Sequence, residues 1–560
     1  MATLTFDLPD LFKLIGKKLP VDELSAILAA MGVPVEGVEG DEIEVEVFPN
    51  RPDMLSVEGV ARNLRGILGI ETGLPATPLK ASDLVVEVDP STKDIRPFIV
   101  CGIARNVTFD DSFIRSVMQI QEKLHATHCR KRRKASIGIY DLDTITGPIR
   151  YVALEPGMIE FVPLSLEGEE EYGTMSGREI LIKHSKGRDY AFTLEDLPRF
   201  PILEDANGQV LSMPPIINSE ETRVSEGTTN LFFDVTGTDL KTICQVLNIF
   251  CALLTDRGAD VGSVEVRYPD AIMVTPELAP STMEVDVAYI TGLLGITLSD
   301  KEVAERLERM RLGVKKKGKG RLEVSVPAFR TDVMHPMDLA EDVAIGHGYD
   351  NFEPSLPAVA TVGAPLPIRD AGDVVRDALI GHGFSEVITF VLTNPDRLFT
   401  RMGEEQRPVA TIANPNSSEF TVVRDRLLPS LIETLERNKR HGYPQRLFEV
   451  GDIVVLDDKA DTGTRNVRRL DGAMAGTDAT FAALKAVVES LGRTLGRSMT
   501  FEAVDEKAFI PGRAARVLVE GAPAGVFGEI HPAVLESFAL EVPVAALEFD
   551  LEVLYNGTQA

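Results

Sequence analysis

Four carboxylates lie close together in the second half of the chain, within the sequence PAFRTDVMHPMDLAEDVAIGHGYD. They are Asp332, Asp338, Glu341 and Asp342. Pro336 favours the first turn of a helix, so the last three stand at positions i, i+3 and i+4 on one helical face. An all-oxygen group of this kind suits a hard cation, and the spacing therefore predicts a Mg²⁺ site.

Two simpler interpretations of this acidic face stay open from the spacing alone. Carboxylates in the first turn of a helix are favoured by the helix dipole without any ligand. A charged helical face is also commonly just a solvated one. Neither interpretation needs a metal ion.

A comparison within the chain favours the metal over these alternatives. Helix, strand, Arg-x-Asp and helix occur in this order near Arg51 and again near Arg330, which predicts two copies of one small α/β module. The aligned pairs, with one gap, are Glu58 with Asp338, Ala61 with Glu341, and Arg62 with Asp342. In this alignment only the second copy carries the full set of carboxylates.

A second polar group lies between residues 203 and 239, on segments flanked by Gly and Pro. It consists of Ser212, Asn218, Asp234 and Thr236. Hydroxyl, amide and carboxylate groups suit recognition of a small polar ligand or positioning of a water molecule. No His or Cys base is near them in the sequence, so a nucleophilic triad is not indicated. Turn residues that bond to their own backbone are the alternative interpretation.

Length and composition describe a multidomain globular protein. At 560 residues the chain is expected to hold about three or four domains, and 44% hydrophobic with 26% charged residues is ordinary for such a protein. The net charge of −28 argues against broad nucleic-acid binding. Any nucleic-acid contact is expected to be local, at the basic runs 130–134 and 315–321. A solvated loop is the alternative for each run.

The sequence also predicts a reduced, cytoplasmic protein with no membrane segment. The first residues, MATLTFDLPDLFKL, lack the basic and apolar pattern of a secretory signal. No apolar run approaches the roughly 20 residues of a membrane span. The four cysteines have no C-x-x-C spacing, which indicates free thiols and neither a zinc site nor disulfides.

Hydrophobic periodicity indicates the elements that must position these side chains. Helices are expected at 20–31, 112–126, 239–258, 299–310, 370–382 and 426–442. Strands are expected at 42–48, 98–107, 136–142, 190–197, 322–327, 386–392, 446–455, 516–521 and 545–554, with a hairpin turn at 315–321. The short turns of the last 200 residues, roughly, predict an antiparallel sheet with flanking helices. The chain has no Walker-type loop and no G-x-G-x-x-G after a strand.

Blocks that carry a family resemblance extend over nearly the whole chain. They are NRPDMLSVEGVAR (50–62), LHATHCRKRRKASIGIYDLD (124–143), GQVLSMPPIIN (208–218), NLFFDVTGTD (230–239), FRTDVMHPMDLAEDVAIGHGYD (329–350), VRDRLLPSLIETLERNKRH followed by RLFEVGD, and PGRAARVLVEG with GEIHP. In this order the chain resembles the β subunit of phenylalanyl-tRNA synthetase, of the archaeal and eukaryotic-cytosolic type.

The resemblance implies a multidomain α+β fold with small duplicated α/β modules, an α/β editing domain and a class II synthetase-like antiparallel-sheet domain. The implied domains are 1–81, an N-terminal α/β module; 82–265, a B3/B4-type editing domain; 270–355, a B5-type module with the acidic cluster; and 356–560, an inactive catalytic-like domain. The last domain lacks the ATP-binding arginines of working class II sites, and Arg446 alone does not restore them.

Partners, a metal and a second activity also follow from the resemblance. It implies an (αβ)₂ tetramer whose α subunit uses ATP to attach phenylalanine to tRNA(Phe). The family's magnesium ligands fall on Asp332, Asp338, Glu341 and Asp342, near the α-subunit contact, where Mg²⁺ would tie the subunits together. The family's editing residues, which act on mischarged Tyr-tRNA(Phe), fall on Leu203, Ser212, Asp234 and Thr236. Asp234 is the candidate to bind the tyrosine hydroxyl.

A different class of function remains an alternative. The chain would then be a non-catalytic scaffold that binds tRNA or an amino acid and holds a structural Mg²⁺ ion. Deacylation of Tyr-tRNA(Phe) separates this scaffold from the editing hypothesis. A Mg²⁺-dependent phosphotransferase is disfavoured, because no phosphate loop or basic clamp lies near the acids.

Overall fold

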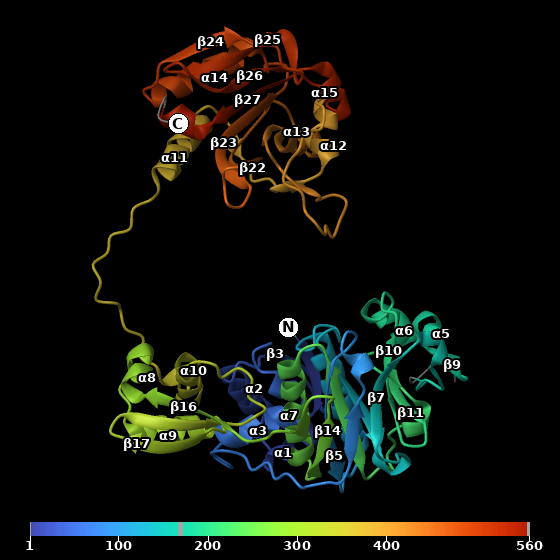
Figure 1. Ribbon diagram of the computed structural model, residues 1–560. Helices are drawn as coiled ribbons and strands as arrows, with labels where there is room; N and C mark the ends of the chain where they lie inside the picture. Colours follow the sequence, from blue (N-terminus) through green and yellow to red (C-terminus); the bar gives the residue numbers. More distant parts are fainter. Residues whose placement is uncertain (1, 166–171, 557–560) are drawn as a thin grey trace. The chain divides into compact units, whose positions relative to one another are not determined.

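The computed structural model describes residues 2–165 and 172–556, which belong to two compact units, Met1–Leu356 and Pro357–Ala560. Unit 1 contains two small α/β modules and a large central sheet, and unit 2 contains a seven-stranded sheet with helices (Figure 1). Within the described residues, no helix is both long and apolar enough to cross a membrane.

The first small module is a three-stranded antiparallel sheet with helices. Its elements are β1 (Ala2–Asp7), α1 (Leu8–Ile15), α2 (Val21–Ala30), β2 (Val35–Glu39), β3 (Glu42–Val47) and α3 (Val57–Ile67). Strand β1 alternates buried and exposed residues, as a strand with one face on the core must. The Asp7 carboxylate accepts a hydrogen bond from the Asp10 amide and so caps α1.

The second small module repeats the first element by element. Its elements are β16 (Ser281–Asp286), α8 (Val287–Leu294), α9 (Asp300–Arg309), β17 (Gly313–Gly318), β18 (Arg321–Val326) and α10 (Pro336–His347). The strand orders β1-β3-β2 and β16-β18-β17 are the same. Register is also the same, because Ala2 pairs with Val47 and Ser281 pairs with Val326, each 279 residues later.

This common shift of 279 residues corrects the gapped alignment of the two modules. No gap is needed, and the aligned pairs are Gly59 with Asp338, Arg62 with Glu341, and Asn63 with Asp342. The expected pairing of Glu58 with Asp338 was therefore wrong by one residue. A Cβ atom at Gly59 would lie 1.8 Å from the Asp53 carbonyl oxygen, so only glycine fits there.

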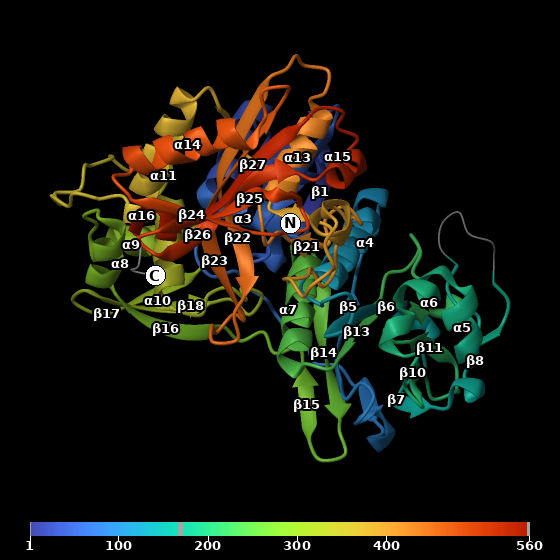
Figure 2. The same cartoon turned by 90° about the horizontal axis from the view of Figure 1, so that it is seen from above.

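The central sheet of unit 1 has ten strands, in the order β12-β11-β10-β7-β4-β14-β5-β13-β6, with β15 paired to β14. Its strands are β4 (Val85–Val88), β5 (Phe98–Arg105), β6 (Ala135–Asp141), β7 (Ile149–Leu154), β10 (Phe200–Glu204), β11 (Val210–Met213), β12 (Ile217–Asn218), β13 (Leu231–Gly237), β14 (Asp260–Arg267) and β15 (Ile272–Thr275). The other elements are α4 (Asp111–Ala126), β8 (Glu160–Phe161), β9 (Met175–Ser176), α5 (Gly177–Lys183), α6 (Ser185–Tyr190) and α7 (Leu240–Asp256). Both views place α5 and α6 at one end of unit 1 and β17 at the other (Figures 1 and 2).

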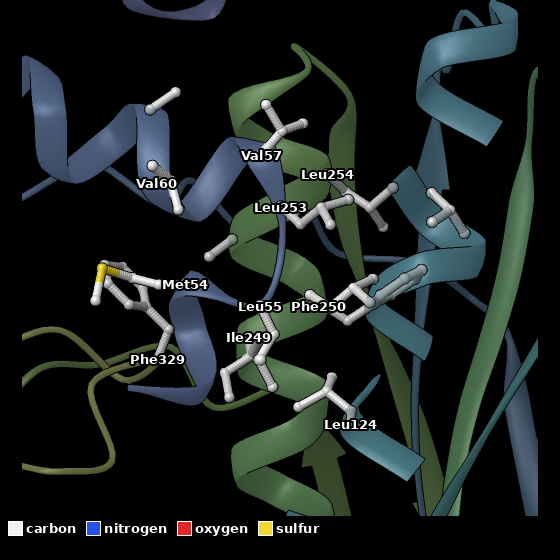
Figure 3. Close-up of a cluster of buried hydrophobic side chains, with 14 of the residues drawn as sticks. Met54, Leu55, Val57, Val60, Leu124, Ile249, Phe250, Leu253, Leu254 and Phe329 are labelled. Carbon is white, nitrogen blue, oxygen red and sulfur yellow. The ribbon is translucent and has the colours of Figure 1, made fainter. Parts of the chain in front are cut away.

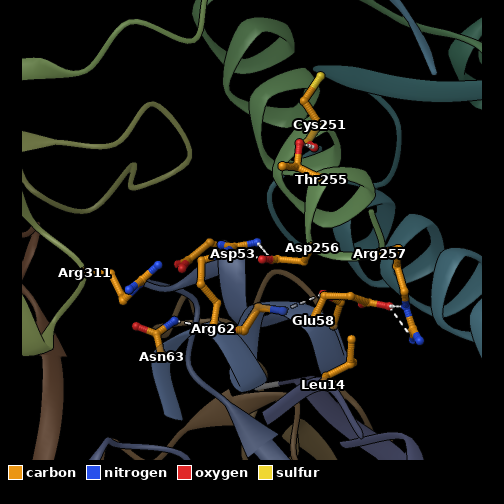
Figure 4. A network of polar contacts seen from close by, with 12 residues as sticks. Leu14, Asp53, Glu58, Arg62, Asn63, Cys251, Thr255, Asp256, Arg257 and Arg311 are labelled. Atoms are coloured by element: carbon orange, nitrogen blue, oxygen red, sulfur yellow. Dashed lines mark hydrogen bonds and ion pairs between the residues drawn. The ribbon is translucent and has the colours of Figure 1, made fainter. Parts of the chain in front are cut away.

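Helix α7 joins the central sheet to the first module. Its buried residues form one hydrophobic core with residues of α3 and α4, and Phe329 from the second module lies beside Met54 in that core (Figure 3). A buried polar network follows at the end of α7. Glu58 accepts hydrogen bonds from Ser116 (2.8 Å) and Arg257 (2.7 Å), and Arg62 donates to Asp256 at 2.8 Å (Figure 4). These bonds fix the orientation of α3.

Unit 2 is built on an antiparallel sheet in which only β19 runs parallel to its neighbour. The strand order is β19 (Ser385–Glu386), β22 (Gln445–Leu456), β23 (Thr464–Ala475), β27 (Val544–Asp550), β26 (Ala522–Ile530), β25 (Phe509–Val519) and β24 (Met499–Ala503). A pair, β20 (Leu392–Thr393) and β21 (Val422–Val423), lies apart. The helices are α11 (Pro367–Gly381), α12 (Pro395–Leu398), α13 (Leu428–Arg437), α14 (Phe481–Thr494), α15 (Pro532–Ser537) and α16 (Leu551–Asn556).

Four expected elements differ from the sequence prediction. The expected strand at 190–197 is the end of α6 and a 3-10 turn, where aromatic rings pack against arginines. The strand at 386–392 is reduced to its two ends, in β19 and β20, and residues 387–390 between them belong to no strand. The lysines of the expected turn at 315–321 partly belong to β17, where they pair with β18. The strand at 545–554 ends at Asp550, whose carboxylate caps the following helix.

Candidate functional site

A cavity of about 670 Å³ lies between helix α4, the edge strand β6 and the segment after β11. Its polar lining includes Glu122, Arg132, Tyr140, Ser212, Asn218 and Asp234. The Asn218 amide donates a hydrogen bond to the Ile139 carbonyl at 3.0 Å, which links β12 to β6, the two ends of the sheet order. The cavity therefore lies where the two ends of one sheet meet.

A buried carboxylate and a buried phenol meet in this cavity. The Tyr140 hydroxyl donates to Asp234 Oδ1 at 2.6 Å and lies 2.7 Å from Ser212 Oγ. All three side chains are buried. Gly138 lies opposite Asp234 in the sheet, and a Cβ atom there would lie 2.1 Å from the Tyr140 hydroxyl oxygen. Glycine at 138 therefore leaves the space in which the phenol reaches the carboxylate.

Burial sets the acidity of this pair. Burial raises the pKa of Asp234 to about 7, against the opposing effects of the Tyr140 hydrogen bond and the Arg96 charge. Burial and the neighbouring Asp234 charge raise the pKa of Tyr140 well above its ordinary value. The phenol thus stays a hydrogen-bond donor, while Asp234 changes its charge in the neutral pH range.

The structure brings together two of the four predicted editing residues at the cavity surface, Ser212 and Asp234. Leu203 pairs with Ser212 across β10 and β11 and is fully buried in the core behind the cavity. Thr236 is also buried, and its hydroxyl accepts a hydrogen bond from Arg96 Nε at 3.0 Å. Leu203 and Thr236 therefore support the lining from behind. They do not form it.

Tyr140 is the residue of this site that sequence reasoning did not single out. It lies in a segment predicted as a strand, where an aromatic residue is expected to be ordinary core. A signal was present, however, since Ser136, Gly138 and Tyr140 share one face of β6 by strand alternation. Serine, glycine and tyrosine in succession on one buried face leave space beside a phenol hydroxyl, which indicates a polar cavity.

A backbone turn in unusual geometry borders the cavity. Arg130, Lys131 and Arg132 have consecutive positive φ angles of 54°, 53° and 62°. Each such residue costs roughly 1–2 kcal/mol relative to right-handed backbone. The turn aims the buried Arg132 side chain at the cavity wall, where it donates to the carbonyls of Pro215 (3.0 Å) and Ile216 (2.8 Å).

The predicted magnesium ligands are arranged around an arginine. The buried Arg330 guanidinium donates to Asp332 at 2.8 and 2.9 Å and to Asp342 at 2.8 and 3.1 Å. Asp338 accepts from the Met334 and His335 amides, both at 2.7 Å, and so caps α10.

The carboxylate oxygens that remain free in this arrangement do not fit a magnesium site within this chain. Glu341 is exposed, and the other three carboxylates already accept hydrogen bonds from an arginine or from the backbone. In the described part of the chain, no group of three or more His, Cys, Asp or Glu side chains is arranged to hold a metal ion. The Mg²⁺ site therefore stays a prediction, and the observed role of Asp342 is to neutralise Arg330.

This structural role can be tested by a matched pair of substitutions. Asp342→Ala is expected to destabilise unit 1 by about 3 kcal/mol, because it removes one partner of a buried ion pair. Glu341→Ala, one residue earlier but exposed, is expected to change stability by less than about 0.5 kcal/mol. Urea unfolding of the full-length chain measures both values. Equal, small effects of the two substitutions would contradict the structural role of Asp342.

Three arginines at the sheet of unit 2 form ion pairs with carboxylates of the same unit. Arg424 donates to Glu449 at 2.8 Å, and Arg426 forms ion pairs with Glu404 and Glu548. The Arg446 guanidinium donates to Asp478 at 2.8 Å and to a backbone carbonyl. Binding of ATP phosphates at this sheet would have to break these pairs.

Comparison with known proteins now defines the class of the chain. The model of a "Phenylalanyl tRNA synthetase beta chain CLM domain" matches residues 353–551, a "tRNA synthetase B5 domain" matches 283–349, and a "B3/4 domain" matches 110–250. Together these modules define a tRNA synthetase subunit.

Full-length relatives identify the family within this class. The phenylalanine–tRNA ligase β subunit of Archaeoglobus fulgidus is 41% identical over 99% of both chains, and that of Thermococcus sibiricus is 40% identical over 98% of both. A solved N-terminal fragment of the phenylalanyl-tRNA synthetase β subunit from Pyrococcus horikoshii has a TM-score of 0.59 at 39% identity, covering 62% of this chain and 99% of the fragment. The chain belongs to the phenylalanine–tRNA ligase β-subunit family.

Proposed function

We propose that the chain works in an (αβ)₂ tetramer with a class II-type α subunit that uses ATP to attach phenylalanine to tRNA(Phe). We further propose that the cavity of this chain hydrolyses mischarged Tyr-tRNA(Phe). Family membership supports the first part, and the paired arginines of unit 2 support a synthetic site on the partner. The observation that carries the second part is a phenol hydroxyl already bound between Asp234 and Ser212.

The need for a second site follows from the chemistry of the two amino acids. Tyrosine differs from phenylalanine by one hydroxyl, and an apolar pocket rejects an added hydroxyl by only about 10²-fold. A site with a buried carboxylate selects the hydroxyl, because phenylalanine would leave the carboxylate without its hydrogen bond. Only Oδ1 of Asp234 accepts a hydrogen bond from a described residue. The second carboxylate oxygen is thus available to a substrate hydroxyl.

We propose Mg²⁺ binding only for the complex assembled with the α subunit. Glu341 is exposed and Asp338 is half-buried at the start of α10. In such a complex, oxygen donors of the α subunit would complete with these two residues a coordination shell of the kind that Mg²⁺ requires.

The role of Tyr140 can be tested through the pH dependence of hydrolysis. Asp234 is ionised above a pH of about 7, so the rate on Tyr-tRNA(Phe) is expected to rise through that pH. Tyr140→Phe removes the hydrogen bond that lowers the pKa of Asp234, and we expect this rise to move to higher pH. The measurement is deacylation of Tyr-tRNA(Phe) by the assembled enzyme between pH 5.5 and 8.5, roughly the range in which such a group titrates.

Tyr268→Phe is the matched control for this experiment. The Tyr268 hydroxyl bonds to the Ile99 backbone and takes no part in the lining. Its loss is expected to leave the profile unchanged. An unshifted profile for Tyr140→Phe would remove Tyr140 from the site, and absence of any hydrolysis by the wild type would favour the scaffold alternative.

A further inference from the structure

We propose that the basic turn, residues 127–134, binds the phosphates of the single-stranded 3′ end of an RNA and directs that end to the cavity. This inference rests on the proposed function for the amino acid that the RNA carries. The binding of the RNA strand itself rests on the turn alone. Four features of the turn carry the argument: its charge, its fixed backbone, its aromatic neighbour and its link to the cavity.

Charge is concentrated on the outer side of the turn. Arg130, Lys131, Arg133 and Lys134 are exposed. Lys134 pairs with Asp239 at 3.4 Å, whereas Arg130 and Lys131 form no ion pair with any residue in 2–165 or 172–556. In a chain with a net charge of −28, adjacent unpaired cations form a local positive site. Such a site attracts phosphates, whereas the predominantly negative remainder of the surface repels them.

The backbone of the turn is held by contacts from below. Arg96 donates to the Arg132 carbonyl at 3.2 Å, and Thr238 donates to the carbonyls of Arg133 (3.1 Å) and Lys134 (3.0 Å). The carbonyl oxygens thus face the protein, and the cationic side chains are left on the outside. Strained backbone that its surroundings fix in this way is typical of binding sites.

An aromatic ring lies directly beside these cations. The Arg133 guanidinium lies 4.9 Å from the centre of the Phe192 ring, and Phe192 is itself among the exposed large hydrophobic residues. Proteins that bind single-stranded nucleic acid combine a basic track for the backbone with aromatic faces on which bases stack. Exposed Arg133 and exposed Phe192 supply one group of each kind, a cation and an aromatic ring, side by side.

The same turn is part of the cavity wall. Arg132 follows Lys131 directly, lines the cavity and is anchored to the Pro215 and Ile216 carbonyls. A phosphate bound at Arg130 or Lys131 would thus be held one or two residues along the chain from the cavity lining. In the proposed arrangement the terminal ribose, with its ester-linked amino acid, enters the cavity beside this turn.

The test removes the two unpaired charges without releasing the turn. Arg130→Asn with Lys131→Asn is the choice, because asparagine tolerates left-handed backbone better than other uncharged residues. The control is Lys315→Asn with Lys319→Asn, an equal charge change at two exposed positions in the β17–β18 hairpin, at the opposite end of unit 1 from α5 and α6.

Binding is measured with the full-length chain and a short labelled RNA that ends in CCA. Each phosphate contact contributes a slope of about −0.7 in log K against log salt, or about fivefold in affinity at 0.1 M salt. The turn variant is expected to bind about 25-fold more weakly, with the slope reduced by about 1.4. Unchanged affinity, or an equal loss in the control variant, would overturn the proposal.

A second readout separates this inference from the proposed function. The turn variant in the assembled enzyme is expected to lose kcat/KM on Tyr-tRNA(Phe) by the same factor and to retain hydrolysis of 3′-O-tyrosyl-adenosine, which has no phosphate. If the cavity does not hydrolyse the ester, wild type is inactive on both substrates. The loss of RNA binding by the turn variant is still expected in that case.

Discussion

Asp234→Asn is expected to lower the hydrolysis of Tyr-tRNA(Phe) by about 10²-fold or more, because the site loses its anionic acceptor for the tyrosine hydroxyl. Asparagine has nearly the same volume, and its amide oxygen still accepts the Tyr140 hydrogen bond now seen at 2.6 Å. The fold is therefore expected to persist. Attachment of phenylalanine to tRNA(Phe) by the assembled enzyme is expected to be unchanged.

The measurement is loss of labelled tyrosine from preformed Tyr-tRNA(Phe), with Asp189→Asn as control. Asp189 is an exposed carboxylate on α6 and forms no hydrogen bond or ion pair with another described residue. Asp189→Asn is therefore expected to leave the rate of hydrolysis unchanged. The wild-type rise in rate through a pH of about 7 should also disappear in Asp234→Asn. Equal rates for wild type and Asp234→Asn would exclude Asp234 from the editing reaction.

The same pKa has a consequence for stability. Burial raises the pKa of Asp234 from an ordinary value of 3.8 to about 7, so the folded chain binds a proton more tightly than the unfolded chain. The stabilisation is complete below pH 3.8 and is lost as the pH rises through about 7. The ionised carboxylate that the proposed editing site needs is thus kept at a cost in stability, as is common for functional groups in buried sites.

Local periodicity was enough to predict the small modules. The capping box of Ser299 and Glu302 is present in the structure, and α9 begins at the expected position. The strand β18 and the Arg330-x-Asp332 unit also follow in the predicted order. Each of these features depends on residues close in sequence, which is why a pattern alone predicts them.

Contacts between segments that are distant in the sequence could not be predicted from local patterns. The meeting of Tyr140 with Asp234 depends on β6 pairing with β13, and the space for it depends on Gly138. Spacing also predicted that the acids of α10 share a face. It did not predict that Arg330 folds back between Asp332 and Asp342 and occupies the centre of the group. A carboxylate in a short motif can pair with a nearby arginine as well as with a metal ion. Here Asp332 and Asp342 pair with Arg330.

The largest effect on assembly is expected from an exposed apolar segment in unit 2, residues 387–391. Ile388 is 93% exposed and Phe390 is 73% exposed, while Thr389 between them faces Glu449. Large apolar side chains presented outward from an ordered backbone mark an interaction surface. Under the proposed (αβ)₂ assembly, this segment is the candidate contact for the second subunit.

Ile388→Asp with Phe390→Asp is therefore expected to abolish stable association with the α subunit, since central apolar anchors contribute about 2 kcal/mol or more each to an interface. Buried aspartates would add a desolvation cost to that loss. The chain itself should stay folded, because both side chains are exposed to solvent on the surface of unit 2 when no partner is bound. Val362→Asp is the control, at a residue that is 96% exposed but lies in the segment that precedes α11. Light scattering after gel filtration measures the assembly, and a double variant that still forms the tetramer would place the subunit contact elsewhere.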